Sequence, residues 1–111
     1  MSEDFDRDRV RELNDQFRQT FEGGQVLMTP GVQALAADTV GKALRAIKEF
    51  DDFDEENDPW QTHEFGSVEV DETSIWFKID AYDSKLEYGS PNPADPEVTK
   101  RVMTILLPSE Y

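Results

Sequence analysis

The 111-residue sequence contains no cysteine, which excludes disulfide bonds, thiolate metal sites and cysteine nucleophiles. It is also poor in positive charge, because 11 Lys and Arg residues stand against 25 Asp and Glu residues, for a formal net charge of −14. A chain this acidic repels phosphate groups and anionic membrane surfaces. We therefore expect neither a direct nucleic-acid partner nor a membrane partner.

Signatures of several enzyme classes and of export are missing as well. Neither G-x-S-x-G nor S-x-x-K occurs, and no glycine-rich loop leads into a Lys-Ser/Thr pair. The first residues, Met1 to Asp4, are polar and acidic, unlike a signal peptide, and no apolar run is long enough to span a membrane. The expected location is the cytoplasm, and no cofactor is expected.

The composition is nevertheless that of a folded chain, with a hydrophobic fraction of 37% and an aromatic fraction of 11%. We expect one domain over residues 1–111, with residues 1–5 frayed. Residue spacing predicts helices over about 6–21 and 38–50, and strands over about 25–29, 64–70, 74–81 and 98–107. The predicted fold class is α+β: two helices packed on a three- to four-stranded antiparallel sheet.

The apolar positions of these elements predict the core. Gly23-Gly24 is expected to end the first helix and Asp38 to cap the second. The last strand is apolar on both faces near its end, which indicates a central place in the sheet. The residues predicted to share the core are Ile75, Phe77, Ile79, Val102, Leu106, Val10, Leu13, Phe17, Leu44 and Ile47.

The densest acidic stretch lies between Glu49 and Glu72, where eleven acidic residues occur without a Lys or Arg. We call residues 51–58 the acidic loop, because the helical spacing ends before it and strand alternation follows it. The loop is either a solvated connection or a docking surface for a basic protein. As a docking surface, the predicted partner-binding residues are Asp51, Asp52, Asp54, Glu55, Glu56, Asp58, Trp60 and Trp76. Trp76 is expected to face outward or to pack on Trp60 beneath the loop.

The loop also invites comparison with a calcium site. Aligning Asp52 with the first position of an EF-hand loop places Asn57 where the turn needs Gly. The same alignment places His63 where a bidentate Glu belongs. With two positions wrong, no metal site is predicted, and weak divalent binding is left as the alternative.

His63 is the only histidine, so a mechanism built on a histidine pair is excluded. It directly precedes a predicted strand, and we expect it to approach Asp80 or Asp83 across the sheet. There it would form a general-base pair. Lone histidines near strand ends are also common as structural residues.

Several motifs occur in a familiar order along the chain. They are Asn14-Asp15-x-Phe17-Arg18, Gly23-Gly24, Thr29-x-Gly31-Val32, Asn57-Asp58-Pro59-Trp60-x-x-His63-x-Phe65-Gly66, Phe77-Lys78-Ile79-Asp80-x-Tyr82-Asp83 and Pro93-Ala94-Asp95-Pro96-x-Val98-Thr99-x-Arg101-Val102. Together they resemble a family of short bacterial proteins, the domain-of-unknown-function family 3768. The resemblance implies no activity. It implies an alternative polar site, made of Asn57, His63, Lys78, Asp80, Tyr82 and Asp83.

These observations lead to two main functional hypotheses, with a housekeeping module that stabilises a larger complex through Trp76 and the C-terminal strand as a third option. The first is a non-enzymatic acidic interaction protein that occupies a basic surface of a nucleic-acid-handling protein, in the manner of a nucleic-acid mimic of the anti-restriction or anti-CRISPR type. The second is a small enzyme or a ligand or metal binder that uses the polar cluster around His63, Lys78, Asp80 and Asp83.

Overall fold

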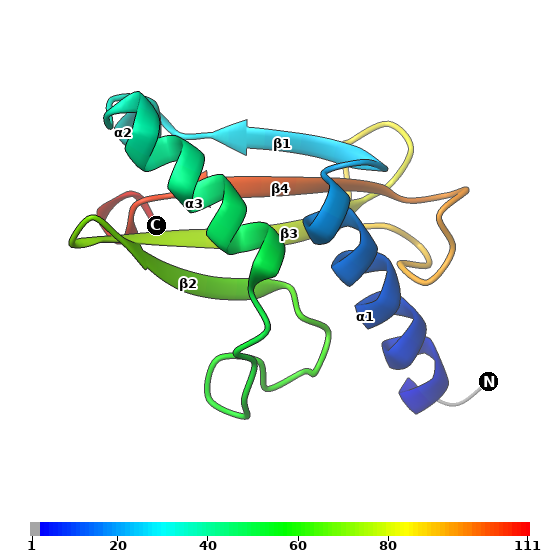
Figure 1. Cartoon of the computed structure of the whole chain (residues 1–111). Helices are drawn as coiled ribbons and strands as arrows, with labels where there is room; N and C mark the ends of the chain where they lie inside the picture. The colour runs from blue at the N-terminus through cyan, green and yellow to red at the C-terminus, as the bar shows by residue number, and fades with distance from the viewer. Residues whose placement is uncertain (1–2) are drawn as a thin grey trace.

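The computed structural model describes the backbone of residues 3–111 and the side chains of residues 6–111. Helices pack on one face of a single four-stranded sheet (Figure 1), so the predicted α+β class is confirmed. The elements are α1 (Glu3–Thr20), β1 (Gly24–Met28), α2 (Pro30–Gln33), α3 (Ala37–Glu49), β2 (Phe65–Val70), β3 (Thr73–Tyr82), β4 (Lys100–Leu106) and the 3₁₀ helix η1 (Pro108–Glu110). Of the residues expected to fray, Met1 and Ser2 lie outside the described part of the chain, and α1 begins at Glu3.

The strand order is β1-β4-β3-β2, so β4 occupies the predicted central place. The prediction of a purely antiparallel sheet is wrong, because β1 runs parallel to β4. Only the β2–β3 pair is joined by a tight hairpin, whose direction the turn dictates. The partner of β1 comes from the far end of the chain, where no local signal fixes its direction.

The β2–β3 hairpin turns at Asp71 and Glu72, whose φ angles are 50° and 66°. Two consecutive left-handed residues match the twist of a two-residue hairpin. The Asp71 carboxylate accepts hydrogen bonds from Thr39 Oγ1 at 2.7 Å and Lys42 Nζ at 3.0 Å, both on α3. The Thr39 bond, followed by Lys42, holds the pKa of Asp71 below its usual value. The turn is thereby fastened to the helix layer.

The core lies between the helices and the sheet, and the register shows which strand faces line it. Phe77 pairs with Ile105 and Ile79 with Met103, and all four side chains are buried on the helix side. Two predicted core residues, Val102 and Leu106, are buried on the opposite face, where Leu106 pairs with Trp76. Because β4 is apolar on both faces, the sequence pattern did not distinguish them. The remaining predicted core positions Val10, Leu13 and Leu44 are half-buried.

The ends of the helices differ in detail from the predictions. α1 ends at Thr20, and the left-handed residue that follows is Phe21 (φ 60°) rather than a glycine. Gly24 is needed for another reason, since a Cβ there would lie 2.4 Å from the Arg101 carbonyl oxygen across the β1–β4 pair. The N-cap of α3 is Ala36 rather than the predicted Asp38. Asp38 lies in the first turn of α3, where its negative charge interacts favourably with the helix dipole.

One carboxylate links the 3₁₀ helix η1 to the start of α2. Glu110 of η1 accepts hydrogen bonds from Thr29 Oγ1, the Leu107 N–H and the Gly31 N–H at 2.5, 2.9 and 3.0 Å. The Thr29 bond is the largest cause of the lowered pKa of Glu110. Thr29 is the N-cap of α2 and makes no side-chain capping bond there.

We expect the substitution Glu110→Gln to destabilise the protein at neutral pH and to make its stability less dependent on acid. A carboxyl group with a lowered pKa in the folded state stabilises above its unfolded pKa, and that contribution is lost as the pH falls through the folded value. The wild type and E110Q should therefore differ most near neutrality and converge in acid. Urea unfolding across the acid range measures this, with the exposed Glu97→Gln as the control. Parallel pH profiles for the wild type and E110Q would contradict it.

Candidate functional site

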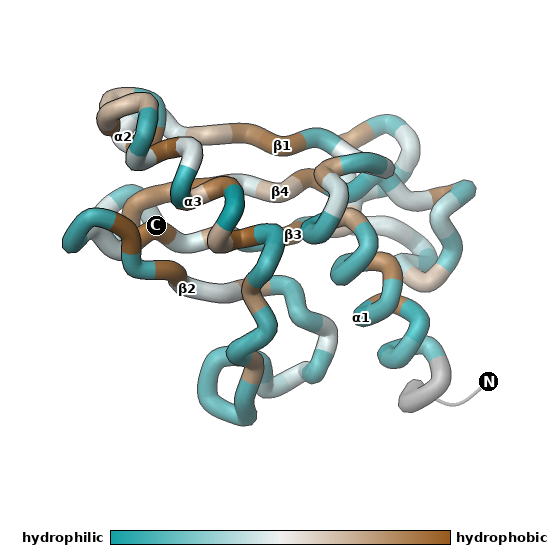
Figure 2. Tube along the Cα trace, viewed as in Figure 1, coloured by the Kyte–Doolittle hydropathy of each residue, from teal (hydrophilic) through white to brown (hydrophobic). Residues whose placement is uncertain are grey.

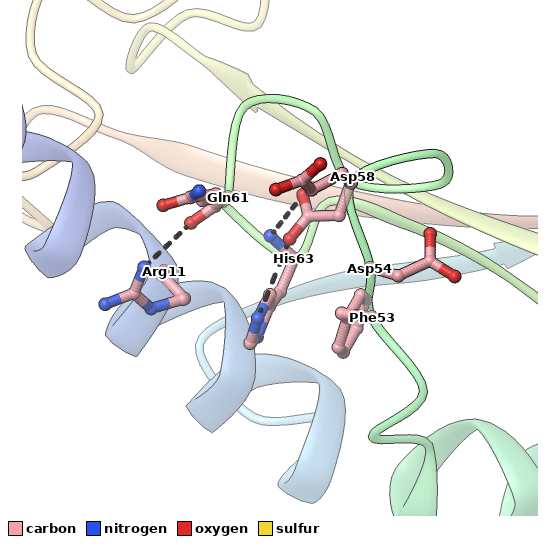
Figure 3. A pocket seen from close by; sticks show the side chains of 7 residues that line it. Arg11, Phe53, Asp54, Asp58, Gln61 and His63 are labelled. Atoms are coloured by element: carbon pink, nitrogen blue, oxygen red, sulfur yellow. Dashed lines mark hydrogen bonds and ion pairs between the residues drawn. The ribbon is translucent and has the colours of Figure 1, made fainter.

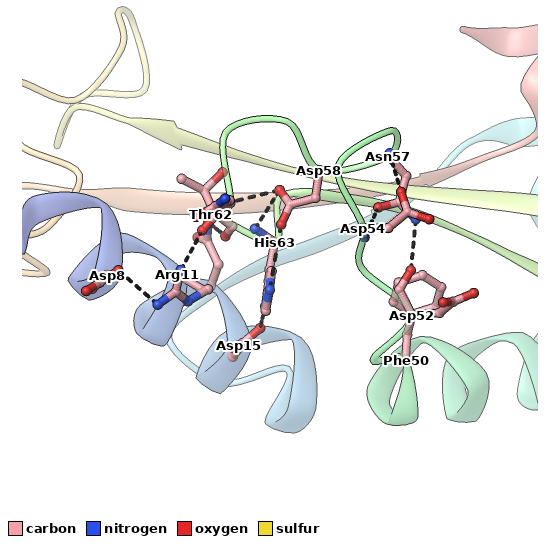
Figure 4. A network of polar contacts seen from close by, with 12 residues as sticks. Asp8, Arg11, Asp15, Phe50, Asp52, Asp54, Asn57, Asp58, Thr62 and His63 are labelled. Carbon is pink, nitrogen blue, oxygen red and sulfur yellow. Dashed lines mark hydrogen bonds and ion pairs between the residues drawn. The ribbon is translucent and has the colours of Figure 1, made fainter. Parts of the chain in front are cut away.

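The acidic loop projects from the end of α3, away from the sheet layer, and is hydrophilic along most of its length (Figures 1 and 2). It is shaped by two of its own side chains, Asp54 and Asn57 (Figure 4). Asp54 Oδ1 accepts the N–H groups of Glu56 and Asn57 at 2.8 and 2.9 Å. The Asn57 amide donates to the Asp52 carbonyl at 2.8 Å and accepts the Asp54 N–H at 2.9 Å. These bonds give the loop a defined backbone.

Phe53 anchors the loop to the core. Its ring meets Phe50 edge-on at 4.8 Å between centroids and Phe77 at 6.5 Å. The ring also stacks in parallel on the His63 imidazole, with 3.8 Å between the ring centroids and an interplanar angle of 4°. Phe53, the single apolar side chain of the acidic loop, therefore contacts both the core and the ring of His63.

His63 lies between two carboxylates (Figure 4). Its Nδ1 is 2.8 Å from Asp15 Oδ1 of α1, and its Nε2 is 3.6 Å from Asp58 Oδ2 of the loop. The Asp58 side chain is only 5% exposed, and its Oδ1 accepts the N–H groups of Thr62 and His63, both at 3.1 Å. The backbone of His63 is left-handed, with φ of 57°, which turns the ring toward α1. The ring thus bridges the loop and the helix.

Arg18 completes the network from within the core. Although it is charged, it is 2% exposed. Its guanidinium donates to Asp15 Oδ1 at 2.8 Å and to the Phe50 carbonyl at 3.0 Å. The guanidinium carbon lies 5.1 Å from the Phe53 ring centroid, within the range of a cation–π contact. Oδ1 of Asp15 therefore contacts both the Arg18 guanidinium and the His63 ring.

A second set of contacts ties the segment before His63 to α1. Asn14 Nδ2 donates to the Thr62 carbonyl at 2.9 Å, and Arg11 donates to the Gln61 carbonyl at 3.1 Å. The side-chain oxygen of Asn14, Oδ1, in turn accepts a hydrogen bond from Arg101 Nε of β4 at 2.7 Å. Burial is the main reason why the pKa of Arg101 lies below its usual value. This chain of bonds connects the loop, the helix and the central strand.

Two open hollows flank this network. One has a volume of about 300 Å³ and is lined by Arg11, Phe53, Asp54, Asp58, Gln61 and His63 among others (Figure 3). The other, about 420 Å³, lies between α1, the end of α3 and the loop, and includes Asp15, Arg18 and Lys48. Phe53 and His63 line both. Among the described residues, no three His, Asp or Glu side chains are placed to hold a metal ion.

The family model described as a protein of unknown function (DUF3768) matches residues 28–110. The chain belongs to this family. The DUF3768 match begins at the last residue of β1, so α1, which supplies Asp15 and Arg18 to the network, lies outside it. No curated protein and no solved structure matches the chain.

The DUF3768 chain does not bring the predicted polar site together around His63. The carboxylates that reach its ring are Asp15 and Asp58 rather than Asp80 or Asp83, which corrects the expected geometry. Asp80 instead pairs with Lys78 at 3.4 Å on the sheet face opposite the helices. Asp83 accepts the N–H groups of residues 85 and 87 and so closes its own turn.

The physical reason is the position of His63. β2 begins two residues after it, so the ring does not follow the alternation of the strand. Glu64 lies between Asp58 on one side and Asp80 on the other, and the residue as a whole is exposed. Its pKa is raised, mainly because its carboxyl is partly shielded from water, and further by the negative charges of Asp58 and Asp80. Tyr82 pairs with Lys100 farther along the sheet, and Asn57 remains inside the acidic loop.

The two tryptophans of the predicted partner-binding set lie apart. Trp60 is 71% exposed, just beyond the acidic loop. Trp76 faces outward, as one of the two expectations had it, and its ring contacts Phe65 and Tyr111 at 5.2 and 5.7 Å rather than Trp60. The acidic loop and Trp76 therefore belong to different surfaces.

The sequence prediction missed Asp15 and Arg18. Both occur in the first motif quoted for the family resemblance, but neither was among the predicted core or site residues. The available signal was the motif itself, because Asp15 and Arg18 are three residues apart and so can pair on one face of a helix. The segments that cover Arg18 and contact Asp15, around Phe50, Phe53 and His63, are distant in the sequence, which residue spacing alone does not reveal.

Proposed function

We propose that this DUF3768 protein is a non-enzymatic interaction protein whose acidic loop occupies a basic surface of a partner. The observation that carries the proposal is a set of exposed, uncompensated carboxylates on a loop with a fixed backbone. Among the described residues, none of Asp51, Asp52, Glu55 and Glu56 forms an ion pair with a Lys or Arg. A loop ordered in advance loses less conformational entropy on binding than a flexible one.

The distribution of positive charge supports the same proposal. Arg18 is buried against Asp15, Lys42 is paired with Asp71, and Lys78 is paired with Asp80. These cations are therefore occupied within the chain and do not neutralise the loop. An acidic projection of this kind attracts a basic surface at long range and accelerates association with it.

The more specific form of the proposal is mimicry of a nucleic acid. The partner would be a nucleic-acid-handling protein whose basic groove normally receives phosphates, as for inhibitors of the anti-restriction or anti-CRISPR type. Three features support it: the small size, the net charge of −14, and carboxylates held on a projecting loop. On this proposal the loop carboxylates stand in for phosphate groups.

The test uses a double charge reversal, E55K/E56K, with E87K/E97K as the matched control. Both variants change the net charge equally, and in both the replaced side chains are exposed. Asp54 is left intact, because its carboxylate shapes the loop. We expect wild type and control to capture the same protein from a bacterial lysate and E55K/E56K to bind it at least about tenfold more weakly. Affinities are then measured with the purified partner.

Salt and competitor DNA separate the two levels of the proposal. Binding that weakens steeply with salt and is displaced by duplex DNA supports the mimic. Binding that is weakened by salt but not displaced by DNA contradicts mimicry while supporting acidic docking. Equal binding by all three proteins in high salt contradicts both.

The competing hypothesis, a small enzyme or ligand binder, has one observation in its favour. His63 lies within hydrogen-bonding distance of Asp15 beside an open hollow. The arrangement favours it less, because both ring nitrogens already face carboxylates of the chain itself. Failure to capture any partner would turn the search to this hollow, through thermal-shift screening of small molecules and metal ions.

A further inference from the structure

We propose that His63 is a proton-dependent clasp that fastens the acidic loop to α1. The clasp is closed when the imidazole carries both ring protons and is weakened when it loses one. That it orders the loop is a statement about the free protein. That it thereby controls partner binding rests on the proposed function.

The clasp follows from what each ring nitrogen faces. Nδ1 is at hydrogen-bonding distance from Asp15 Oδ1, and Nε2 is at ion-pair distance from Asp58 Oδ2. In the part of the chain that the structure describes, the partner of each nitrogen is a carboxylate oxygen. A doubly protonated imidazolium donates toward both carboxylates, whereas a neutral ring has only one N–H to offer. With the neutral ring, a nitrogen lone pair faces a negatively charged oxygen on one side.

The Asp58 arm matters most for the loop. Asp58 is almost fully buried, and its other oxygen holds the N–H groups of Thr62 and His63. Loss of the ring charge leaves this buried carboxylate without a cation in ion-pair distance among the described residues. A buried charge without a counter-charge is unfavourable, which lowers the free-energy cost of opening the segment that carries it.

Other charges around the ring act in both directions. On the α1 side the cations are Arg18, which shares Asp15 with the ring, and Arg11, which lines the neighbouring hollow. The remaining charged groups that line the two hollows beside His63 are Lys48 and Glu49 at the end of α3 and Asp51, Asp54 and Glu55 of the loop. Glu64 follows His63 directly in the chain.

The ring is also well placed to transmit its protonation to the loop. It stacks face to face on Phe53, the apolar anchor of the acidic loop. Opening of the clasp therefore removes an ionic contact and loosens a stacked pair at the same point.

The experiment follows amide hydrogen exchange of residues 54–63 while the charge of His63 is monitored by NMR. As the only histidine, its ring gives a single unambiguous signal. We expect these amides, corrected for intrinsic exchange, to become about three- to tenfold less protected as the ring loses its proton. Amides of the β3–β4 pair should show no such step. A wild-type loop whose protection does not change while the His63 signal titrates would overturn the proposal.

Two variants test the assignment of the step to this clasp. In H63N the side chain cannot titrate, and Asn tolerates the left-handed backbone of this position. In D58N the amide oxygen still accepts the two N–H groups, but the charge is removed. Both should lose the step. A step that persists in either folded variant would overturn the proposal, and if one variant does not fold, the other decides.

Binding distinguishes this inference from the proposed function. If the loop step is present and partner affinity falls with it, both are supported. A step in the free protein with no partner captured contradicts the proposed function and leaves the clasp supported. A partner bound through Glu55 and Glu56, with no step in the free protein, supports the proposed function and overturns the clasp.

Discussion

Truncation of Phe77 to alanine should lower the free energy of unfolding by about 3–5 kcal/mol. The ring is fully buried at the centre of the helix-facing side of β3. It meets Phe50 and Phe53 edge-on, and it lies so close to Gly66 that a Cβ there would be 2.4 Å from the ring. Neighbours held this tightly by backbone elements cannot collapse into the space, so a cavity remains.

Urea unfolding measures the effect, with Lys78→Ala as the control. Lys78 is the next residue of β3, points to the opposite face and makes a surface ion pair with Asp80. Its loss should change the free energy of unfolding by no more than about 0.5–1 kcal/mol. A loss below about 1 kcal/mol for F77A would show that the ring is not tightly packed against Phe50, Phe53 and Gly66.

Replacement of Arg18 by methionine should cost about 3 kcal/mol of stability, the lower end of the range for breaking a buried pair on one side. Methionine fills the volume between Phe53 and Phe77 but leaves the Phe50 carbonyl without its donor. It also removes one of the two side chains that contact Asp15 Oδ1, the other being His63. The lower end applies because Asp15 is partly exposed and water can compensate it in part.

Arg45→Met, on the exposed side of α3, is the matched control and should be nearly neutral. R18M should also increase amide exchange in the acidic loop, because Arg18 holds the Phe50 carbonyl at its root. An R18M protein as stable as R45M, with an unchanged loop, would contradict the role given to the guanidinium. Arg18→Lys should recover little, since a lysine cannot bridge both acceptors with a planar fork.

The layer structure was predictable from the sequence because each element carries its own local signal. The alternation in β2 and β3 identified both strands, and in β3 it also identified the buried face. The face assignment of β4 was not predictable, since both of its faces are apolar and an alternating pattern is then lost. The parallel partner of β1 was not predictable either, because pairing between distant segments leaves no local trace.

The candidate site was predictable only in its acidic half. The density of carboxylates identified the loop directly, and its acidic side chains are exposed except that of Asp58, which was predicted to bind a partner but is buried. The position of His63 was not predictable, since its left-handed backbone and its contact with Asp15 depend on how α1 lies against the loop. The burial of Arg18 was not predictable either, because the two rings that cover it, Phe53 and Phe77, are distant from it in the sequence.

The strand order has a consequence for synthesis of the chain. β4 lies between β1 and β3, so each of these two strands has one long edge that only β4 can satisfy. A ribosome delivers β4 after every other strand. Until then β1 has no strand partner, and Asn14 on α1 lacks the Arg101 donor that holds it. Before β4 is made, the chain therefore carries a β1 segment without a strand partner and a β2–β3 hairpin with one open edge, and the sheet can close only when β4 joins them.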